Sequence, residues 1–213
     1  MALDFLEGLK VLDLGQDISA AFCARLFADL GAHVIKVEPP SGDPCRYLGP
    51  YAGDLPDRER SGLFLSLNTN KLGVTLSLES STGRELLLQL ADGADLLVES
   101  YLPSYLPSVG LGYSQLHQRN PSLVVTSITP FGQPGPWAEY QANNLIVSNL
   151  SGHSREHGGA VENTEEQPPL QLAAHQADFV AGLAGATASM LALNRRRGTG
   201  EGCHVDVSGM EAL

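Results

Sequence analysis

Three neighbouring segments decide the fold of this chain: Leu9-Lys-Val-Leu-Asp-Leu14, Ile18 to Leu30 and His33-Val-Ile-Lys-Val37. The first and third are short apolar runs, which are typical of buried strands. The middle segment carries apolar residues at helical spacing and is followed by Gly31, a common residue at helix ends. Residues 9–37 are therefore predicted to form a compact strand–helix–strand unit.

The rest of the chain continues to alternate strand and helix. We predict a helix over 80–91, a strand over 95–99, a helix over 113–119, a strand over 122–128, a small-residue helix from Asp178 to Leu193 and a strand over 203–207. This alternation favours an α/β fold with a doubly wound, mostly parallel, Rossmann-like sheet flanked by helices. The first strand-to-helix turn, residues 15–19, lacks the GxGxxG pattern of dinucleotide-binding proteins.

Less regular segments lie between these elements. Residues 39–61 are rich in Pro and Gly and are predicted to form a loop. Two short strands are expected at 63–67 and 73–78, and a loop or short helix at 103–112. Residues 153–170 are a polar excursion before the Asp178 helix.

Charge and composition exclude several classes of function. The 213 residues carry a net charge of −11, and between residues 85 and 194 only Arg119 and Arg155 are basic. Nucleic acid is therefore not an expected partner, because binding it requires clustered basic side chains. Three widely spaced cysteines without a CxxC motif, an acidic N-terminus and no apolar run of membrane-spanning length predict a reduced cytoplasmic location without a membrane. No second ligand pair stands near Cys203 and His204, so no metal is expected.

Asp178 has two possible roles at the start of its helix. Aspartate is a preferred N-cap, whose side chain accepts hydrogen bonds from free backbone amides. The helix dipole also keeps such a carboxylate ionised, as a nucleophilic carboxylate must be. The residues around Asp178 leave both interpretations open, and His175 is interpreted as a plain polar neighbour.

Several segments in order resemble class III coenzyme A transferases, the family of formyl-CoA, carnitine-CoA and related acyl-CoA transferases and of alpha-methylacyl-CoA racemase. They are residues 8–14 and 23–43, Asn70-Lys71, residues 94–99 and 110–113, Asn120-Pro121, residues 131–136 and Gly198-Thr-Gly-Glu-Gly202. The resemblance covers nearly the whole chain. It implies that residues 1–213 are the N-terminal large α/β domain of such an enzyme, with the small domain and the C-terminal return to the large domain absent from this chain.

The resemblance also implies a reaction. Asp178 falls where the family keeps its nucleophile, which attacks an acyl-CoA thioester and becomes an aspartyl-CoA thioester before a carboxylic acid acceptor takes the CoA. Coenzyme A is then bound as part of the acyl-CoA substrate, and the full-length protein is expected to be a homodimer. The stretch Gln141-Ala-Asn-Asn144 offers no imidazole for proton transfer, which counts strongly against the racemase branch.

Contacts to CoA are implied for six residues: Ile18, Ser19, Lys36, Asn70, Lys71 and Tyr101. For some of these residues an interpretation without CoA contact remains open. Lys36 and Glu38 together fit a solvated salt pair, and Asn70-Lys71 fits a polar turn.

The chain departs from the family at positions that usually contact CoA. Glu79, Ser100, Leu102 and Ser108 stand where relatives carry Lys, Asn, Arg and Arg. Lost charge-assisted contacts to phosphate weaken binding. A degenerate, non-catalytic module with a structural or dimer-assembly role is therefore the alternative to a CoA-transferase domain, and a CoA-linked lyase or ligand-sensing module on the same scaffold is a third possibility.

Overall fold

The computed structural model describes residues 4–157, 168, 170 and 173–213. In these residues six parallel strands form one sheet in the order β3-β2-β1-β4-β5-β6. The strands are β1 (Lys10–Asp13), β2 (His33–Glu38), β3 (Lys71–Thr75), β4 (Leu96–Glu99), β5 (Val124–Thr129) and β6 (His204–Ser208). The order reverses between β1 and β4, which makes the sheet doubly wound and confirms the predicted fold class.

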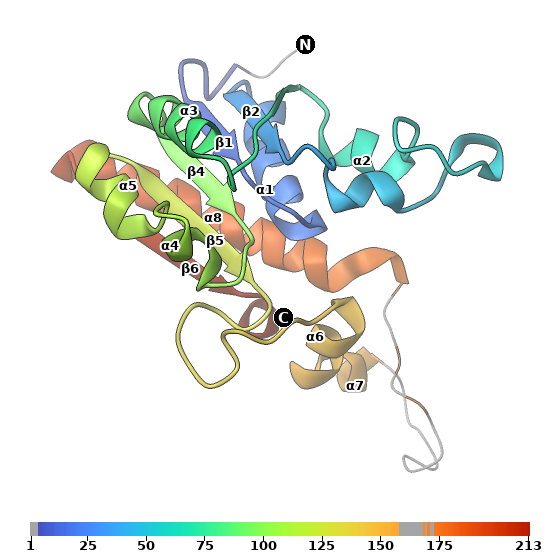
Figure 1. The fold of residues 1–213 in the computed structure, drawn as a ribbon. Coiled ribbons are helices and arrows are strands. Elements are labelled where there is room, and N and C mark those ends of the chain that lie inside the picture. The colour runs from blue at the N-terminus through green and yellow to red at the C-terminus, as the bar shows by residue number, and fades with distance from the viewer. Residues whose placement is uncertain (1–3, 158–167, 169, 171–172) are drawn as a thin grey trace.

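Helices cover both faces of the sheet (Figure 1). On one face, α1 (Ile18–Asp29) and α8 (Gln176–Thr199) pack against Val11, Val98 and Ile128. On the other face, α3 (Ser81–Asp92), α4 (Tyr105–Ser108) and α5 (Tyr113–Arg119) pack against Leu12, Leu97 and Val125. Adjacent strand residues thus serve opposite faces, as the pleat requires.

The remaining helical segments are short. They are the helices α2 (Gly62–Leu67), α6 (Asn144–Leu150), α7 (His153–His157) and α9 (Gly209–Ala212) and the single-turn helices η1 (Pro44–Tyr47), η2 (Ala52–Asp54) and η3 (Ala173–His175). Of the predicted polar excursion, residues 153–157 form α7, and most of the remainder lies outside the described residues.

The segment 63–67 corrects the sequence prediction, because it forms the helix α2 and not a strand. Ser61 is its N-cap and accepts a hydrogen bond from the backbone N–H of Phe64 at 3.1 Å. Phe64 and Leu67, three residues apart, share the buried face of the helix. The next strand, predicted over 73–78, forms earlier as β3, and the predicted loop 39–61 contains η1 and η2.

Helix α8 lies at the centre of one layer. Together with η3 it spans Ala173–Thr199 and, by length and composition alone, could cross a membrane; 44% of its most apolar window is buried inside the protein. Gly182 faces the backbone of α1 and Gly185 faces Ile128 on β5, so the helix packs closely on both. In this fold α8 is the core helix that fixes the position of Asp178.

Candidate active site

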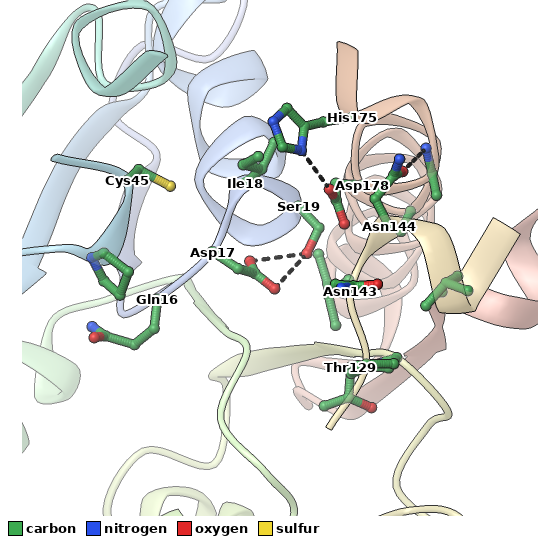
Figure 2. Close-up of a pocket in the computed structure, with 18 of the residues that line it drawn as sticks. Gln16, Asp17, Ile18, Ser19, Cys45, Thr129, Asn143, Asn144, His175 and Asp178 are labelled. Atoms are coloured by element: carbon green, nitrogen blue, oxygen red, sulfur yellow. Dashed lines mark hydrogen bonds and ion pairs between the residues drawn. The ribbon is translucent and has the colours of Figure 1, made fainter. Parts of the chain in front are cut away.

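A cavity of about 360 Å³ opens at the carboxyl edge of the sheet, where open α/β sheets bind ligands. We call it the α8 cavity. Its walls come from the β1–α1 turn, η1, the end of β5, α6 and the first turn of α8 (Figure 2). The polar side chains in its lining are those of Gln16, Asp17, Ser19, Thr129, Asn143, Asn144, His175 and Asp178.

Asp178 lies in the first turn of α8 and lines this cavity. The N-cap of the helix is His175, so the interpretation of Asp178 as an N-cap is wrong. The side chain of Asp178 is 28% exposed. Its Oδ2 lies 3.4 Å from Nδ1 of His175, which is its ion-pair partner among the described residues. Burial raises the pKa of Asp178, whereas the charge and hydrogen bond of His175 lower it. The carboxylate of Asp178 is thus partly exposed to the cavity, and its contact to His175 is long.

Asn144 fixes the start of α8 against α6. Asn144 is 4% exposed, and its Oδ1 accepts a hydrogen bond from the backbone N–H of Ala177 at 2.9 Å. Asn143 caps α6 by accepting from the N–H of Ile146 at 3.1 Å. The residue next to Asp178 is therefore tied to a second wall of the cavity, and Asn144 is a site residue that was not predicted from the sequence.

A second carboxylate, that of Asp17, lines the same cavity. It is the N-cap of α1: Oδ1 accepts from the N–H of Ala20 at 3.0 Å, and the Ser19 hydroxyl donates to both oxygens. Burial raises the pKa of Asp17 to about 6, and the nearby charge of Asp178 adds to this. Asp17 is not among the predicted site residues, although an Asp before an apolar helical run is an N-cap signal.

Three of the predicted site residues come together, because Ile18 and Ser19 line the α8 cavity with Asp178. Tyr101 lies elsewhere. It lines a separate cavity of about 250 Å³, which we call the β2 cavity, with Glu38, Pro39, Leu76 and Ser77 among its other walls. The ring of Tyr101 stacks on Tyr105 with centroids 4.7 Å apart.

Lys36 and Lys71 lie inside the protein, around Asp13. The Lys36 ammonium lies 2.6 Å from Asp43 Oδ2 and 3.6 Å from Asp13 Oδ1, and the Lys71 ammonium lies 2.8 Å from Asp13 Oδ2. Both lysine side chains are at most 2% exposed. Burial would raise the pKa of Asp13, but the two ammonium groups hold it below its usual value. A solvated Lys36–Glu38 pair is therefore a wrong interpretation.

This charge cluster supports the wall of the α8 cavity. Asp13 Oδ1 accepts from the N–H of Gly15, and Lys36 donates to the carbonyl of Gly15, at the turn that carries Asp17. Glu38 pairs with Arg46 at 2.6 Å. Asn70 lies on the surface, where its amide donates to Asp29 at 2.9 Å. Direct contacts of Lys36, Asn70 and Lys71 with CoA stay predictions, and their side chains have protein partners here.

Two of the residues that depart from the pattern of the resembled family, Ser100 and Ser108, make hydrogen bonds within the fold. The Ser100 hydroxyl accepts from the N–H of Gln16 at 2.9 Å, which ties β4 to the β1–α1 turn. The Ser108 hydroxyl donates to the carbonyl of Tyr105 at 2.7 Å. Glu79 lines the β2 cavity. Among the described residues that line the α8 and β2 cavities there is no Lys or Arg.

No group of three or more His, Cys, Asp or Glu side chains suited to a metal ion occurs in the described part of the chain. His204, on the edge strand β6, contacts Ser127 through Nε2 at 2.8 Å and stacks on Tyr113.

Comparison with known proteins identifies the scaffold around this site. The sequence model of CoA-transferase family III matches residues 6–213. The chain belongs to this family. Among solved structures, a CAIB/BAIF family protein from Brucella suis superposes with a TM-score of 0.85 and 31% identity, covering 97% of this chain and 53% of that one.

Curated relatives of this CoA-transferase family III chain carry named activities. Subunit BbsE of succinyl-CoA:(R)-benzylsuccinate CoA-transferase from Thauera aromatica is 40% identical over 212 residues, which are 100% of this chain and 50% of the relative. Succinyl-CoA:glutarate CoA-transferase from Homo sapiens is 32% identical over 203 residues, 94% and 44% of the two chains. The chain thus spans about half the length of the curated relatives it matches.

Proposed function

We propose that the protein is an acyl-CoA:carboxylate CoA-transferase in which Asp178 is the nucleophile. The observation that carries this proposal is the carboxylate of Asp178, which is partly exposed in a cavity at the carboxyl edge of the sheet and does not cap its helix. Membership in CoA-transferase family III and the named activities of the relatives support it.

The proposed reaction is covalent catalysis in two halves. An oxygen of Asp178 attacks the thioester carbonyl of the acyl-CoA, the C–S bond breaks, and a mixed anhydride and the CoA thiolate result. The thiolate attacks the Asp178 carbonyl, which releases the first carboxylate and leaves aspartyl-CoA. The acceptor carboxylate then repeats these steps in reverse order, so that Asp178 returns to its carboxylate and no proton is consumed.

Substrate placement follows from the two cavities. We place the reacting thioester in the α8 cavity beside Ile18 and Ser19, which are both 5% exposed and form part of its wall. The β2 cavity, with Tyr101, lies at the same edge of the sheet and suits a more distant part of CoA. Lys36 and Lys71 act in this proposal by holding the β1–α1 turn in place.

The assembly around the site is also a proposal. The relatives are about twice as long as this chain, which supports the view that residues 1–213 are the large domain of a longer protein. Leu183 and Leu191 on α8 are 54% and 68% exposed, and Leu150 on α6 is 52% exposed. Apolar side chains of this size suit an interface, so we propose a homodimer. A cytoplasmic location is proposed from the composition alone.

A degenerate module without activity is the second candidate, motivated by Glu79, Ser100, Leu102 and Ser108. Calorimetric titration with CoA separates the two. Binding at micromolar CoA, on the order of −8 kcal/mol, contradicts the degenerate module, whereas no heat at millimolar CoA supports it.

The proposal is tested by intact-protein mass spectrometry of the full protein after incubation with succinyl-CoA, the donor named for several relatives. We expect the mass to increase by that of CoA and hydroxylamine to remove the addition. Asp178→Asn should abolish it, while Asp17→Asn, which keeps the α1 cap, should retain it. An unmodified wild-type protein, or an Asp178→Asn variant that still gains CoA, would refute the proposed role of Asp178.

A further inference from the structure

His175 has an unusual backbone conformation for a residue that begins a helix. Its φ and ψ are 57° and 36°, and those of Ala174 before it are 57° and 41°. Both are left-handed, a conformation that is unfavourable for residues other than Gly. Such strain is retained where the surrounding structure enforces it, often at functional sites. The conformation therefore calls for a reason in what the His175 side chain does.

Helix capping does not supply that reason. As the N-cap of α8, His175 makes no side-chain hydrogen bond to the helix backbone. Its ring instead lines the α8 cavity, with Nδ1 3.4 Å from Oδ2 of Asp178 (Figure 2). The side chain is 41% exposed, so the ring also has an open side. The backbone conformation thus places an imidazole next to the proposed nucleophile.

The charges that face this imidazole are negative. Asp178 lies on the same helix, and Asp17 lines the cavity from the β1–α1 turn. The thiol of Cys45 comes from η1, and the amides of Asn143 and Asn144 come from α6. Among the described residues that line the cavity there is no Lys or Arg, and His175 is the one whose side chain can become a cation.

A carboxylate acceptor needs such a charge at one stage of the proposed reaction. While Asp178 is a carboxylate, it is the partner of the imidazolium. Once Asp178 is an uncharged thioester, the imidazolium has lost that partner, while Asp17 stays in the cavity wall as a second carboxylate. We infer that His175 binds the acceptor carboxylate and holds it for attack on aspartyl-CoA. The inference rests on the proposed function.

The role conserves charge and atoms through the second half-reaction. One acceptor oxygen forms a bond to the Asp178 carbonyl carbon, the C–S bond breaks, and the negative charge leaves on the CoA thiolate. When the thiolate has attacked the acceptor carbonyl, the charge returns to Asp178 and to its contact with His175. The imidazolium keeps its proton throughout.

The inference is tested by discharging the CoA adduct with two nucleophiles of different charge. The full protein is loaded with succinyl-CoA, freed of small molecules, and mixed with succinate or with hydroxylamine, which is neutral. The variants are His175→Asn, which tolerates a left-handed backbone, and His175→Gln. His33→Gln, which removes an exposed imidazole on β2, is the matched control.

We expect both His175 variants to lose adduct to succinate about 10- to 100-fold more slowly than wild type, the range for one charge-assisted hydrogen bond. Discharge by hydroxylamine should stay within about twofold, because a neutral nucleophile does not need the cation. His33→Gln should match wild type in both respects.

Other outcomes overturn the inference in distinguishable ways. If the His175 variants discharge the adduct equally slowly with succinate and with hydroxylamine, His175 has a structural role. If their discharge by succinate is unchanged, His175 has no role in binding the acceptor. An adduct that forms in wild type but not in the variants would assign His175 to adduct formation, against the inference. If wild type forms no adduct, the proposed function itself fails, and this inference fails with it.

Discussion

Asp178 makes fewer interactions with the protein than three other carboxylates of the fold, those of Asp13, Asp17 and Glu99. Asp13 is fully buried between two ammonium groups, and Asp17 accepts hydrogen bonds from the first turn of α1. Glu99 is 4% exposed and accepts from the N–H of Tyr101 at 2.8 Å. Asp178 has one histidine contact at 3.4 Å and a more exposed side chain. Of these four, it is the carboxylate best placed to attack a substrate.

Glu99 gives a test of the electrostatics at the scale of one residue. Burial raises its pKa to about 7, above the ordinary value of 4.5. A raised folded-state pKa means that the stability linked to Glu99 is fully present below about pH 4.5 and is lost as the pH rises through about 7. We expect Glu99→Gln to gain stability relative to wild type between about pH 5 and about pH 8, by up to about 3 kcal/mol.

Urea unfolding at several pH values measures this difference. Glu85→Gln serves as the control, because the Glu85 side chain is 54% exposed. The same free-energy difference between Glu99→Gln and wild type at every pH would contradict the effect assigned to burial.

At the scale of elements, the position of Asp178 depends on how closely α8 approaches α1. A Cβ atom at Gly182, one turn beyond Asp178, would lie 2.5 Å from the backbone carbonyl oxygen of Ser19. A Cβ atom at Gly185 would instead contact the Cδ1 end of Ile128, a flexible side chain. The two glycines therefore differ in what a substitution would displace: backbone at the cavity wall in one case, a side-chain end in the other.

This difference predicts unequal effects of the same substitution. Gly182→Ala should lower the free energy of unfolding by about 1–3 kcal/mol through overpacking. Gly185→Ala should cost less, because its Cβ meets the Cδ1 end of the Ile128 side chain, which can shift more easily than the backbone that Gly182→Ala would displace. Urea denaturation of both variants checks this. A loss at Gly185 that equals or exceeds the loss at Gly182 would contradict the packing described for α8.

The local elements were predictable where a segment carries its own signal. The β1–α1–β2 unit follows from two short apolar runs and a helix ending near Gly31. The segment 63–67 was not predictable, because a short apolar run fits a strand or a helix until its packing is known. The cap at Ser61 was the signal that the strand interpretation overlooked.

At the scale of the whole molecule, the site depends on segments that are far apart in the chain. The position of Asp178 could be predicted, but its surroundings could not, because Asp17, Asn144 and His175 meet only once β1, α6 and α8 share one edge of the sheet. The pairing of Lys36 and Lys71 with Asp13 was hidden for the same reason. The resemblance implies a nucleophile at Asp178, and the fold shows which groups lie around that side chain.

The most direct test of the central claim follows oxygen atoms. If Asp178 forms a mixed anhydride with the acceptor, it keeps one acceptor oxygen when the CoA thiolate departs with the acyl group. The full protein is therefore turned over with succinyl-CoA and ¹⁸O-labelled succinate, and the peptide that contains Asp178 is weighed. The account predicts a gain of about 2 Da for each oxygen acquired, located on Asp178. Turnover with an unlabelled Asp178 would contradict it.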